Sequence, residues 1–493
     1  METLQRTANR GSISTATSFD IDNSCKFAKG NSETMYRQQV NGDRRTWTSS
    51  FWIKFCGGTG SGTDTHMLYH GVYGQGTRMF TSGGTDQLYI DLCSTGDERY
   101  RWITNRVFRD RSAWYHIVWR VDTTQSSLSD RMRLYVNGEQ ITSWQKEADD
   151  ADSDNVNNGN KMPQNYQTLA NYDHGGYDKM QFSYKEASIY ADMYIAEFHH
   201  CDGYSYAPTE FGESDSDTGI WKPIEPSVSY GNSGCHLDFE DSSNMGNDVN
   251  GGTDFTLQNI SAADQATDTP TNNFCILNTN HVGNYYKLPT DGGTYMPMNG
   301  VNQDAAYAGT IGVTQGKWYY ETYIDMRSST YGLTVFVGYH TFQGNYDANA
   351  YYSSSNQESF VGYKMHAGTS YSWDSGSRVL DTNPAGLGTS QVGQFVGVAL
   401  NLDDNQISFY VNGSAISNAT NLPLNDLGDE TDTGIFALPA ISVYDNNHTV
   451  NFGGYTKATI SSAQSDANGY GTFEHAPPSG YYALCSKNLA EFG

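Results

Sequence analysis

Residues 131–141, with the sequence RMRLYVNGEQI, combine the two signals that decide the fold. Charged and apolar side chains alternate in the first part, and this period of two is typical of a β-strand. Asn137 and Gly138 can both adopt positive φ, as the centre of a type I′ hairpin requires. A similar stretch, FYVNGSAI, occurs at residues 409–416, about 275 residues later and too far away for a short-period repeat. The two copies predict one hairpin in each of two separate sandwiches.

The same alternation recurs along most of the chain, between turns that are rich in Gly, Asn, Asp and Ser. Many short strands at nearly regular spacing are typical of antiparallel sandwiches. We therefore predict an all-β fold of two tandem antiparallel β-sandwiches with few helices, in which one face of each strand is buried and the other meets water. The aromatic side chains expected to fill the cores include Trp52, Trp114, Trp119 and Trp318.

Composition excludes several classes of partner. Asp and Glu number 55 while Lys and Arg number 29, so the net charge is −26. Nucleic acids and anionic membrane surfaces are bound by cationic groups, so we expect neither as a partner. Aromatic residues make up 13% of the chain, which a disordered acidic protein would not contain. No run approaches the ~18 apolar residues of a membrane-spanning helix, so no membrane insertion is expected.

The first residues and the cysteines indicate where the chain folds. The opening METLQRTANRGSISTATSFDID has no apolar core and predicts no secretory signal. The seven cysteines are widely spread and form no CxxC pair. Both features favour reduced, half-buried thiols in a chain that folds in a cytosol.

Two breaks in the pattern divide the chain. Residues 261–271, SAADQATDTPT, are polar, do not alternate and contain a proline, as is typical of a linker. A second break, APPSG, lies at residues 476–480. We predict a first sandwich over residues 1–260, a linker over 261–279, a second sandwich over 280–456 and a C-terminal tail over 457–493.

The first sandwich resembles laminin-G-like modules, which have a concanavalin A-like, lectin-type jelly roll. Four stretches carry the resemblance in the order of that family: TWTSSFWIKF at 46–55, SAWYHIVWRVDTTQ at 112–125, MRLYVNGEQI at 132–141 and MYIAEFHHCDG at 193–203. Residues 236–256, HLDFEDSSNMGNDVNGGTDFT, look like the glycine-aspartate hairpin that often accompanies such modules.

The second sandwich, over residues 280–455, resembles a SPRY domain. Six signals keep the order and spacing of that family: GKWYYE at 316–321, VFVGY at 335–339, GQFVGVAL at 393–400, ISFYVNG at 407–413, LPA at 438–440 and VNFG at 450–453. SPRY domains are β-sandwiches that bind rather than catalyse, so the resemblance implies a binding role.

This order of modules, in an acidic chain rich in Gly, Asn and Tyr, resembles virion proteins of tailed bacteriophages. The resemblance implies a non-enzymatic structural protein, in a tail fibre or tail-associated part, that exposes both sandwiches for host-surface attachment. A head fibre or capsid decoration protein that mainly contacts other subunits is the alternative. Either protein would assemble in the host cytoplasm and reside on the virion. The implied partners are other virion proteins, a host-surface glycan or protein, and further copies of the chain, with a trimer expected by analogy with phage fibres.

The sequence contains no strong catalytic pattern. Jelly-roll glucanases place two carboxylates on one strand as Glu-x-Asp-x-x-Glu, and this pattern is absent. We interpret Asp91, in LYIDL at residues 88–92, as a solvent-facing strand residue. GxSxG and P-loop motifs are absent as well, so no catalytic residue is predicted. A polysaccharide-degrading enzyme built from dispersed carboxylates is a further alternative.

Two patterns are candidates for metal binding. Adjacent residues of a strand face opposite sides, so His199 and His200 should not share one ion unless a bulge intervenes. Asp150, Asp152 and Asp154 present oxygens at alternate positions of an acidic loop, and Ca²⁺ is the one cofactor that this pattern favours. The match to an EF-hand fails at Asn155 and Lys161, which leaves a solvated acidic loop as the alternative. Two further acidic groups are secondary candidates, namely Glu213, Asp215 and Asp217, and Asp241, Asp248 and Asp254.

Aromatic residues predicted to lie in loops are the candidate ligand-binding residues. Flat rings stack on sugars, and tyrosine also provides contact area at protein interfaces at a low entropic cost. The sequence does not distinguish sugar binding from subunit packing. The residues concerned are Tyr351, Tyr352, Tyr371, Trp373, Tyr204 and Tyr206.

Overall fold

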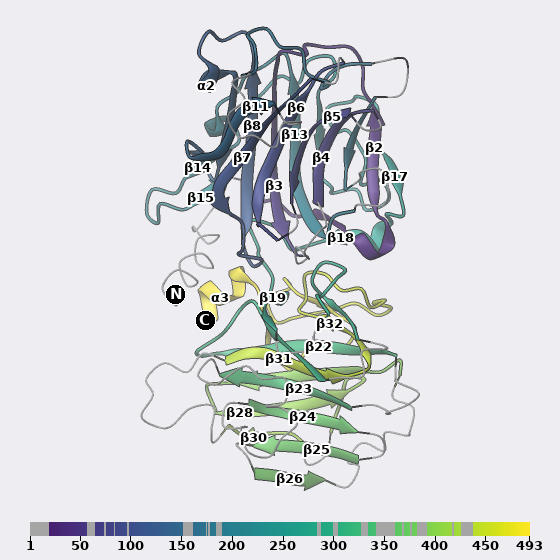
Figure 1. Ribbon diagram of the computed structural model, residues 1–493. Coiled ribbons are helices and arrows are strands. Elements are labelled where there is room, and N and C mark those ends of the chain that lie inside the picture. Colours follow the sequence, from purple (N-terminus) through teal and green to yellow (C-terminus); the bar gives the residue numbers. More distant parts are fainter. Residues whose placement is uncertain are drawn as a thin grey trace. The chain divides into compact units, whose positions relative to one another are not determined.

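The computed structural model describes most of the chain, and all structural statements below concern those residues (Figure 1). The described residues are 19–56, 65–72, 75–82, 84–95, 98–150, 161–173, 175, 178–183, 190–282, 287–298, 304–326, 334–341, 360–366, 369–374, 377–381, 392–416, 419–424 and 437–493.

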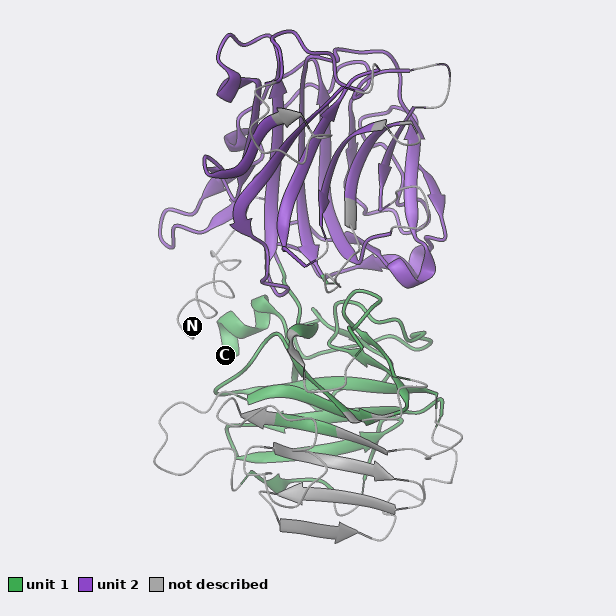
Figure 2. Ribbon diagram, in the orientation of Figure 1, with its two compact units in different colours: residues 1–10, 56–58, 272–493 green, residues 11–55, 59–271 purple. Residues whose placement is uncertain are grey.

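The chain divides into two compact units, each of them a β-sandwich (Figure 2). One unit comprises residues 11–55 and 59–271, and the other comprises residues 1–10, 56–58 and 272–493. We call them the first and the second sandwich. The prediction of two tandem antiparallel β-sandwiches is therefore confirmed.

The first sandwich contains two large antiparallel sheets. One sheet has the order β10 (Glu139–Gln140), β9 (Met132–Val136), β8 (Trp114–Asp122), β3 (Thr46–Phe55), β13 (Met193–Asp202), β1 (Ser24–Phe27) and β18 (Gln265–Ala266), and β16 (Cys235–Leu237) also pairs with β13. The other has the order β11 (Trp144–Asp150), β7 (Arg99–Val107), β6 (Gln87–Cys93), β5 (Gln75–Thr81), β4 (Thr65–Val72), β12 (Lys179–Phe182), β2 (Thr34–Gln38) and β17 (Thr256–Gln258). A small hairpin is formed by β14 (Gly212–Ser214) and β15 (Trp221–Pro223).

The second sandwich also contains two large sheets. One has the order β19 (Leu277–Val282), β21 (Asp304–Gly309), β31 (Ala437–Tyr444), β23 (Thr334–Thr341), β24 (Phe360–His366), β25 (Thr369–Asp374) and β26 (Ser377–Asp381). The other has the order β20 (Tyr295–Pro297), β32 (Asn447–Asn451), β22 (Lys317–Met326), β27 (Phe395–Asn401), β28 (Gln406–Val411) and β29 (Ser414–Ala415), with β30 (Leu422–Pro423) beside β28 and β35 (Tyr482–Ala483) beside β22. β33 (Gln464–Ser465) and β34 (Thr472–Phe473) form a short hairpin.

Helices are short in the described part of the chain. They are α2 (Leu128–Arg131), α3 (Ser486–Phe492) and the 3₁₀ turns η1 (Lys29–Asn31), η2 (Pro208–Glu210) and η3 (Ala262–Asp264). Among the described residues, none of these helices has the length and apolar character needed to cross a membrane.

Both predicted Asn-Gly hairpins are confirmed. Asn137 and Gly138 have φ of 50° and 78°, and Asn412 and Gly413 have φ of 47° and 74°. In each turn the asparagine side chain accepts a hydrogen bond from a backbone N–H of the neighbouring strand, that of His116 or that of Phe395. The asparagine thus fixes both the turn and its position against the next strand.

The core of the first sandwich lies between its two sheets, as the period of two predicts. Along β8, Tyr115, Ile117, Trp119 and Val121 alternate into this core with Phe51 and Ile53 of β3 and with Leu68, Ile90 and Trp102 of the facing sheet. Of the predicted core tryptophans, Trp119 and Trp318 lie in the sandwich cores. Trp52 and Trp114 are also buried, but on the outer face of their sheet, where Trp52 stacks on His116 and Trp114 donates a hydrogen bond to Asp268. All seven cysteines are buried, whereas half-buried thiols were expected.

The residues predicted to form a linker and a tail are parts of the two sandwiches in the structure. Within 261–271, β18 pairs with β1, and the buried Asp268 forms an ion pair with Lys54 at 2.7 Å, so this stretch belongs to the first sandwich. Within 457–493, β35 pairs with β22 in parallel, and Phe473 and Cys485 are fully buried. The polar composition of the two segments gave no sign of these strand pairings and buried contacts, because they join residues that are far apart in the sequence.

Candidate functional site

The outer face of one sheet of the first sandwich carries a second layer. Residues after β13 pass over β8 and β9, where Phe211 packs with Val118, Tyr135 and Cys201. Trp221 of β15 donates an indole hydrogen bond to Nδ1 of His116 at 2.9 Å. The expectation that the alternate side chains of these strands face water is therefore wrong, because residues 204–230 cover them.

Two of the predicted ligand-binding residues lie where this cover begins. Tyr204 is 41% exposed, and its ring stacks on that of Tyr206, with centroids 5.4 Å apart and planes inclined by 10°. Thr48 of β3 holds both residues, since its hydroxyl donates to the carbonyl of Tyr204 and accepts from the N–H of Tyr206, each at 2.9 Å. Ser205 between them accepts a hydrogen bond from Arg120. The two stacked rings form an aromatic surface that is fixed to the sheet and flanked by polar groups. We call this pair the Tyr204–Tyr206 step, or the aromatic step.

A β-bulge changes the direction of side chains in the middle of β13. The register against β3 shifts between Ala196 and His199, and Glu197 has a φ of 46°. Such a bulge places one extra residue in the strand and redirects its side chains. Before the bulge Ile195 faces the core, and after it Phe198 does, so the extra residue lies between them.

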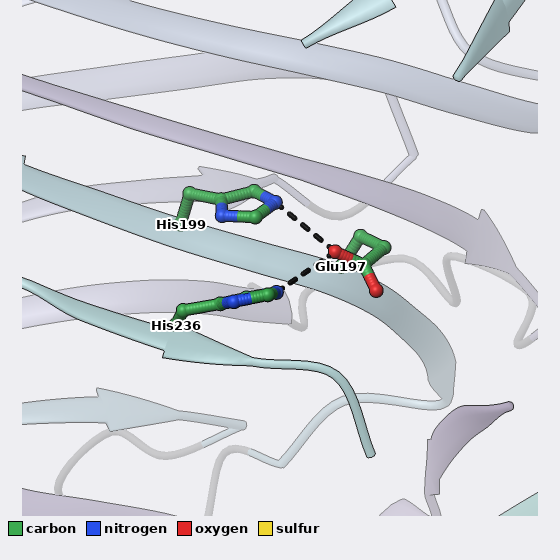
Figure 3. Close-up of side chains that lie close together, drawn as sticks. All are labelled: Glu197, His199 and His236. Carbon is green, nitrogen blue, oxygen red and sulfur yellow. Dashed lines mark hydrogen bonds and ion pairs between the residues drawn. The ribbon is translucent and has the colours of Figure 1, made fainter. Parts of the chain in front are cut away.

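The bulge brings Glu197 together with two histidines. Figure 3 shows both imidazole rings pointing at the same carboxylate oxygen of Glu197. Nε2 of His199 lies 3.1 Å from Oε2 of Glu197, and Nε2 of His236, on β16, lies 2.9 Å from it. The two imidazole rings stack, with centroids 4.2 Å apart. We call these three residues the Glu197 cluster.

The Glu197 cluster is largely buried. Glu197 is 6% exposed and His199 is 2% exposed, whereas the side chain of His236 is 21% exposed. Burial alone would raise the pKa of Glu197, but hydrogen bonds from His199 and His236 outweigh it and lower the pKa to about 2. Burial lowers the pKa of His199. A charged Glu197 carboxylate beside a neutral His199 imidazole is thus the stable state near neutral pH.

The prediction that His199 and His200 cannot share an ion agrees with the geometry. His200 faces the core, where its ring contacts Ser49 Oγ at 2.8 Å and Asn171 Oδ1 at 2.8 Å. His199 faces the opposite side and lies 2.9 Å from the hydroxyl of Tyr230 through Nδ1. Sequence reasoning missed Glu197 and His236 as partners because a bulge and a pairing across 39 residues carry no local signal.

The interpretation of Asp91 as a solvent-facing strand residue is wrong. Asp91 is fully buried, and it accepts hydrogen bonds from Arg78 at 2.9 Å and from Arg101 at 2.6 Å. Burial would raise the pKa of Asp91, but Arg101 and Arg78 more than compensate and lower it. The two arginines come from the neighbouring strands β5 and β7.

The secondary acidic candidates are engaged within the first sandwich. Lys222 pairs with Glu213 at 3.3 Å and with Asp215 at 3.4 Å. Asp248 forms an ion pair with Arg37 at 3.1 Å. Protein cations therefore already pair with Glu213, Asp215 and Asp248.

The remaining predicted site residues are placed only in part. Tyr371 and Trp373 lie on β25, paired with β24 and β26, and not in a loop as expected. Asp150 is the last residue of β11. Asp152, Asp154, Tyr351 and Tyr352 lie outside the described residues, so the proposed Ca²⁺ loop stays a prediction.

Comparison with known families assigns both sandwiches. Residues 29–184 match the model of the concanavalin A-like lectin/glucanases superfamily, and residues 317–454 match that of the SPRY domain. The chain thus carries a concanavalin A-like domain followed by a SPRY domain. No curated protein matches the chain. The Glu197 cluster and the Tyr204–Tyr206 step lie after the matched part of the concanavalin A-like domain, but within the same compact unit.

Several solved structures are similar to parts of the chain. The SPRY domain of human HERC1 is 15% identical over 35% of this chain and 96% of that one, with a TM-score of 0.26. A heptameric SAP-like pentraxin from Limulus polyphemus is 12% identical over 38% and 80%, with a TM-score of 0.26. A Bacteroides ovatus protein described as carbohydrate-binding is 14% identical over 49% and 59%, with a TM-score of 0.30.

Proposed function

We propose that the protein is a non-enzymatic binding protein whose concanavalin A-like domain attaches to a glycan through the Tyr204–Tyr206 step. The observation that carries the proposal is the exposed Tyr204 ring, stacked on Tyr206 and fixed to β3 through Thr48. A pre-ordered aromatic surface loses little entropy on binding. Arg120 and Ser205 add polar groups at its edge for contact with sugar hydroxyls.

The biological setting that we propose is a tailed-phage virion, in a tail fibre or tail-associated part that contacts the host surface. The order of the two domains and the acidic, tyrosine-rich composition support this setting. The runner-up is a head fibre or capsid decoration protein in which the same aromatic step packs against another subunit. Both settings imply a homo-oligomer on the particle, for which a trimer is the expected state.

The first experiment measures binding of the purified chain to host-type surface polysaccharides, with Tyr204→Ala as the test variant. We expect the variant to lose at least tenfold in affinity while its melting temperature stays close to that of the unmodified chain, because Tyr204 is exposed. Tyr470→Ala is the matched control. Tyr470 is 36% exposed, close to the 41% of Tyr204, but it belongs to the second sandwich. Equal polysaccharide binding by all three chains would contradict the role of the aromatic step.

Two further measurements separate the alternatives. An antibody against the protein should block adsorption of particles if the protein attaches to hosts, and should leave adsorption unchanged if it decorates the head. Incubation with host polysaccharide should release no reducing ends. Release of reducing ends would overturn the non-enzymatic part of the proposal.

A further inference from the structure

We propose that the Glu197 cluster is a binding site for Zn²⁺, with one oxygen of Glu197 and the Nε2 atoms of His199 and His236 as ligands. Two imidazoles and one carboxylate are a donor set that suits zinc, usually with water in the fourth position. The site does not involve Tyr204 or Tyr206, so the proposal stands independently of glycan binding.

The distances allow an ion to enter with little movement. The three ligand atoms all lie within 4.8 Å of one another, and the two Glu197–His contacts are 3.1 Å and 2.9 Å. Ligands about 2.05 Å from a tetrahedral zinc ion lie roughly 3.3 Å apart. Each Glu197–His contact therefore needs to lengthen by only a few tenths of an ångström, and the two Nε2 atoms, which lie within 4.8 Å of each other, move to about 3.3 Å apart.

Tyr230 allows His199 to present a lone pair to the ion. A neutral imidazole coordinates through Nε2 only if its proton lies on Nδ1, and Nδ1 of His199 is 2.9 Å from the Tyr230 hydroxyl. That hydroxyl can accept from Nδ1–H or donate to Nδ1, so it satisfies either tautomer. A hydrogen-bonding partner on the second ring nitrogen is typical of histidines that bind metal ions.

Access and charge both favour a cation on the His236 side. His236 is the least buried member of the cluster, so water or an ion can reach its ring while Glu197 and His199 stay enclosed. Glu240 is exposed and lies within electrostatic range of both Glu197 and His236, and Asp238 lies in the same segment. These carboxylates raise the local concentration of divalent cations.

The bulge at Glu197 has a structural rationale in this proposal. A glutamate at positive φ carries a conformational cost, and such a residue is retained where the surrounding structure requires it. Here the bulge turns the carboxylate toward two histidines on paired strands. A bound ion would link β13 to β16 and so close the loop of residues 203–234 that covers the sheet.

The test uses the 493-residue chain without a histidine tag, treated with chelator and then titrated with Zn²⁺ by calorimetry. We expect one high-affinity ion per chain. At a hundredfold excess of Zn²⁺ over the dissociation constant, the melting temperature of the first sandwich should rise by about 5–10 °C. Co²⁺ in place of Zn²⁺ should give the visible absorption of a tetrahedral nitrogen–oxygen site.

The decisive variant is His236→Gln, because glutamine can still donate a hydrogen bond to Glu197 but is a poor zinc ligand. It should fold, lose at least a hundredfold in Zn²⁺ affinity and lose the Co²⁺ absorption. His475→Ala, which removes a half-buried histidine of the SPRY domain, is the matched control and should bind like the unmodified chain. Equal Zn²⁺ affinity in His236→Gln, or no stoichiometric binding by the unmodified chain, would overturn the proposal.

Discussion

Glu321, on β22, shows how a single buried residue can connect distant parts of the SPRY domain. Its carboxylate is fully buried and accepts hydrogen bonds from the backbone N–H groups of Glu474 and His475 and from the hydroxyl of Tyr319. Burial raises its pKa to about 7, despite these donors. In Asp91 the pKa is lowered instead, because two arginines donate hydrogen bonds to its carboxylate and stabilise the charged form. Neighbouring groups, and not residue type, decide which buried carboxylate is charged.

A pH dependence of stability follows from Glu321. Its folded-state pKa of about 7 lies above the ordinary glutamate pKa of 4.5, so the folded chain holds the proton more tightly. This stabilisation is fully present below pH 4.5 and is lost as the pH rises through 7. The free energy of unfolding of the SPRY domain should fall by on the order of 3 kcal/mol over that window.

Denaturant unfolding between pH 4.5 and 8 measures this slope, and Glu321→Gln should remove most of it. Asp325, whose pKa burial raises to about 6, adds a contribution of the same sign that the variant retains. An unchanged slope in Glu321→Gln would contradict the assignment to Glu321.

At the scale of elements, the two Asn-Gly hairpins are alike in backbone but differ in surroundings. A Cβ atom on Gly138 would lie 2.4 Å from the ring of Trp221, whereas one on Gly413 would lie 3.2 Å from His475. The first hairpin is packed under the β15 segment, so its glycine is required by space as well as by φ. The second requires glycine mainly for its φ.

Alanine substitution should therefore affect the two hairpins unequally. Both Gly138→Ala and Gly413→Ala place a side chain at positive φ, which costs about 1–2 kcal/mol. Gly138→Ala must also displace Trp221 and its hydrogen bond to His116, so we expect a total loss of roughly 3 kcal/mol. Hydrogen exchange of peptides from β8–β9 and from β27–β28 reports each loss in the full chain. Equal losses at the two sites would mean that Trp221 moves away without cost.

At the scale of the whole molecule, residues 457–493 complete the SPRY domain. β35 extends the sheet beside β22, and Phe473, Ala483 and Cys485 share a small core with Phe274 and Tyr319. The peptide groups of residues 474 and 475 also satisfy Glu321. This segment thus belongs to the domain that it follows.

Deletion of residues 457–493 should unfold the SPRY domain and spare the concanavalin A-like domain. The deletion exposes one side of β22, removes most of the small core around Phe274 and Tyr319, and leaves the buried Glu321 without its backbone donors. A typical domain is stable by only about 5–15 kcal/mol, so the combined loss should unfold it. Calorimetry of the deleted chain should show one fewer unfolding transition. A SPRY transition with unchanged temperature and enthalpy would show that residues 457–493 are dispensable.

The sequence by itself determined the strands and turns, which depend on residues close together along the chain. Alternation identified the strands, and Asn-Gly identified the two hairpins, because side-chain direction and turn geometry follow from a few consecutive residues. The order of short motifs then indicated the two families.

Only the tertiary structure decided which distant side chains meet. Glu197 reaches His236, Asp91 lies between Arg78 and Arg101, and Asp268 pairs with Lys54 across 214 positions. The contacts of Glu197 and Asp91 depend on strand order, and that of Glu197 depends also on the position of a bulge. A shift of one residue would turn these two side chains to the opposite face. The local sequence predicts a solvated Asp91 and a linker at residues 261–271. Both predictions fail because the partners that bury these residues come from other strands.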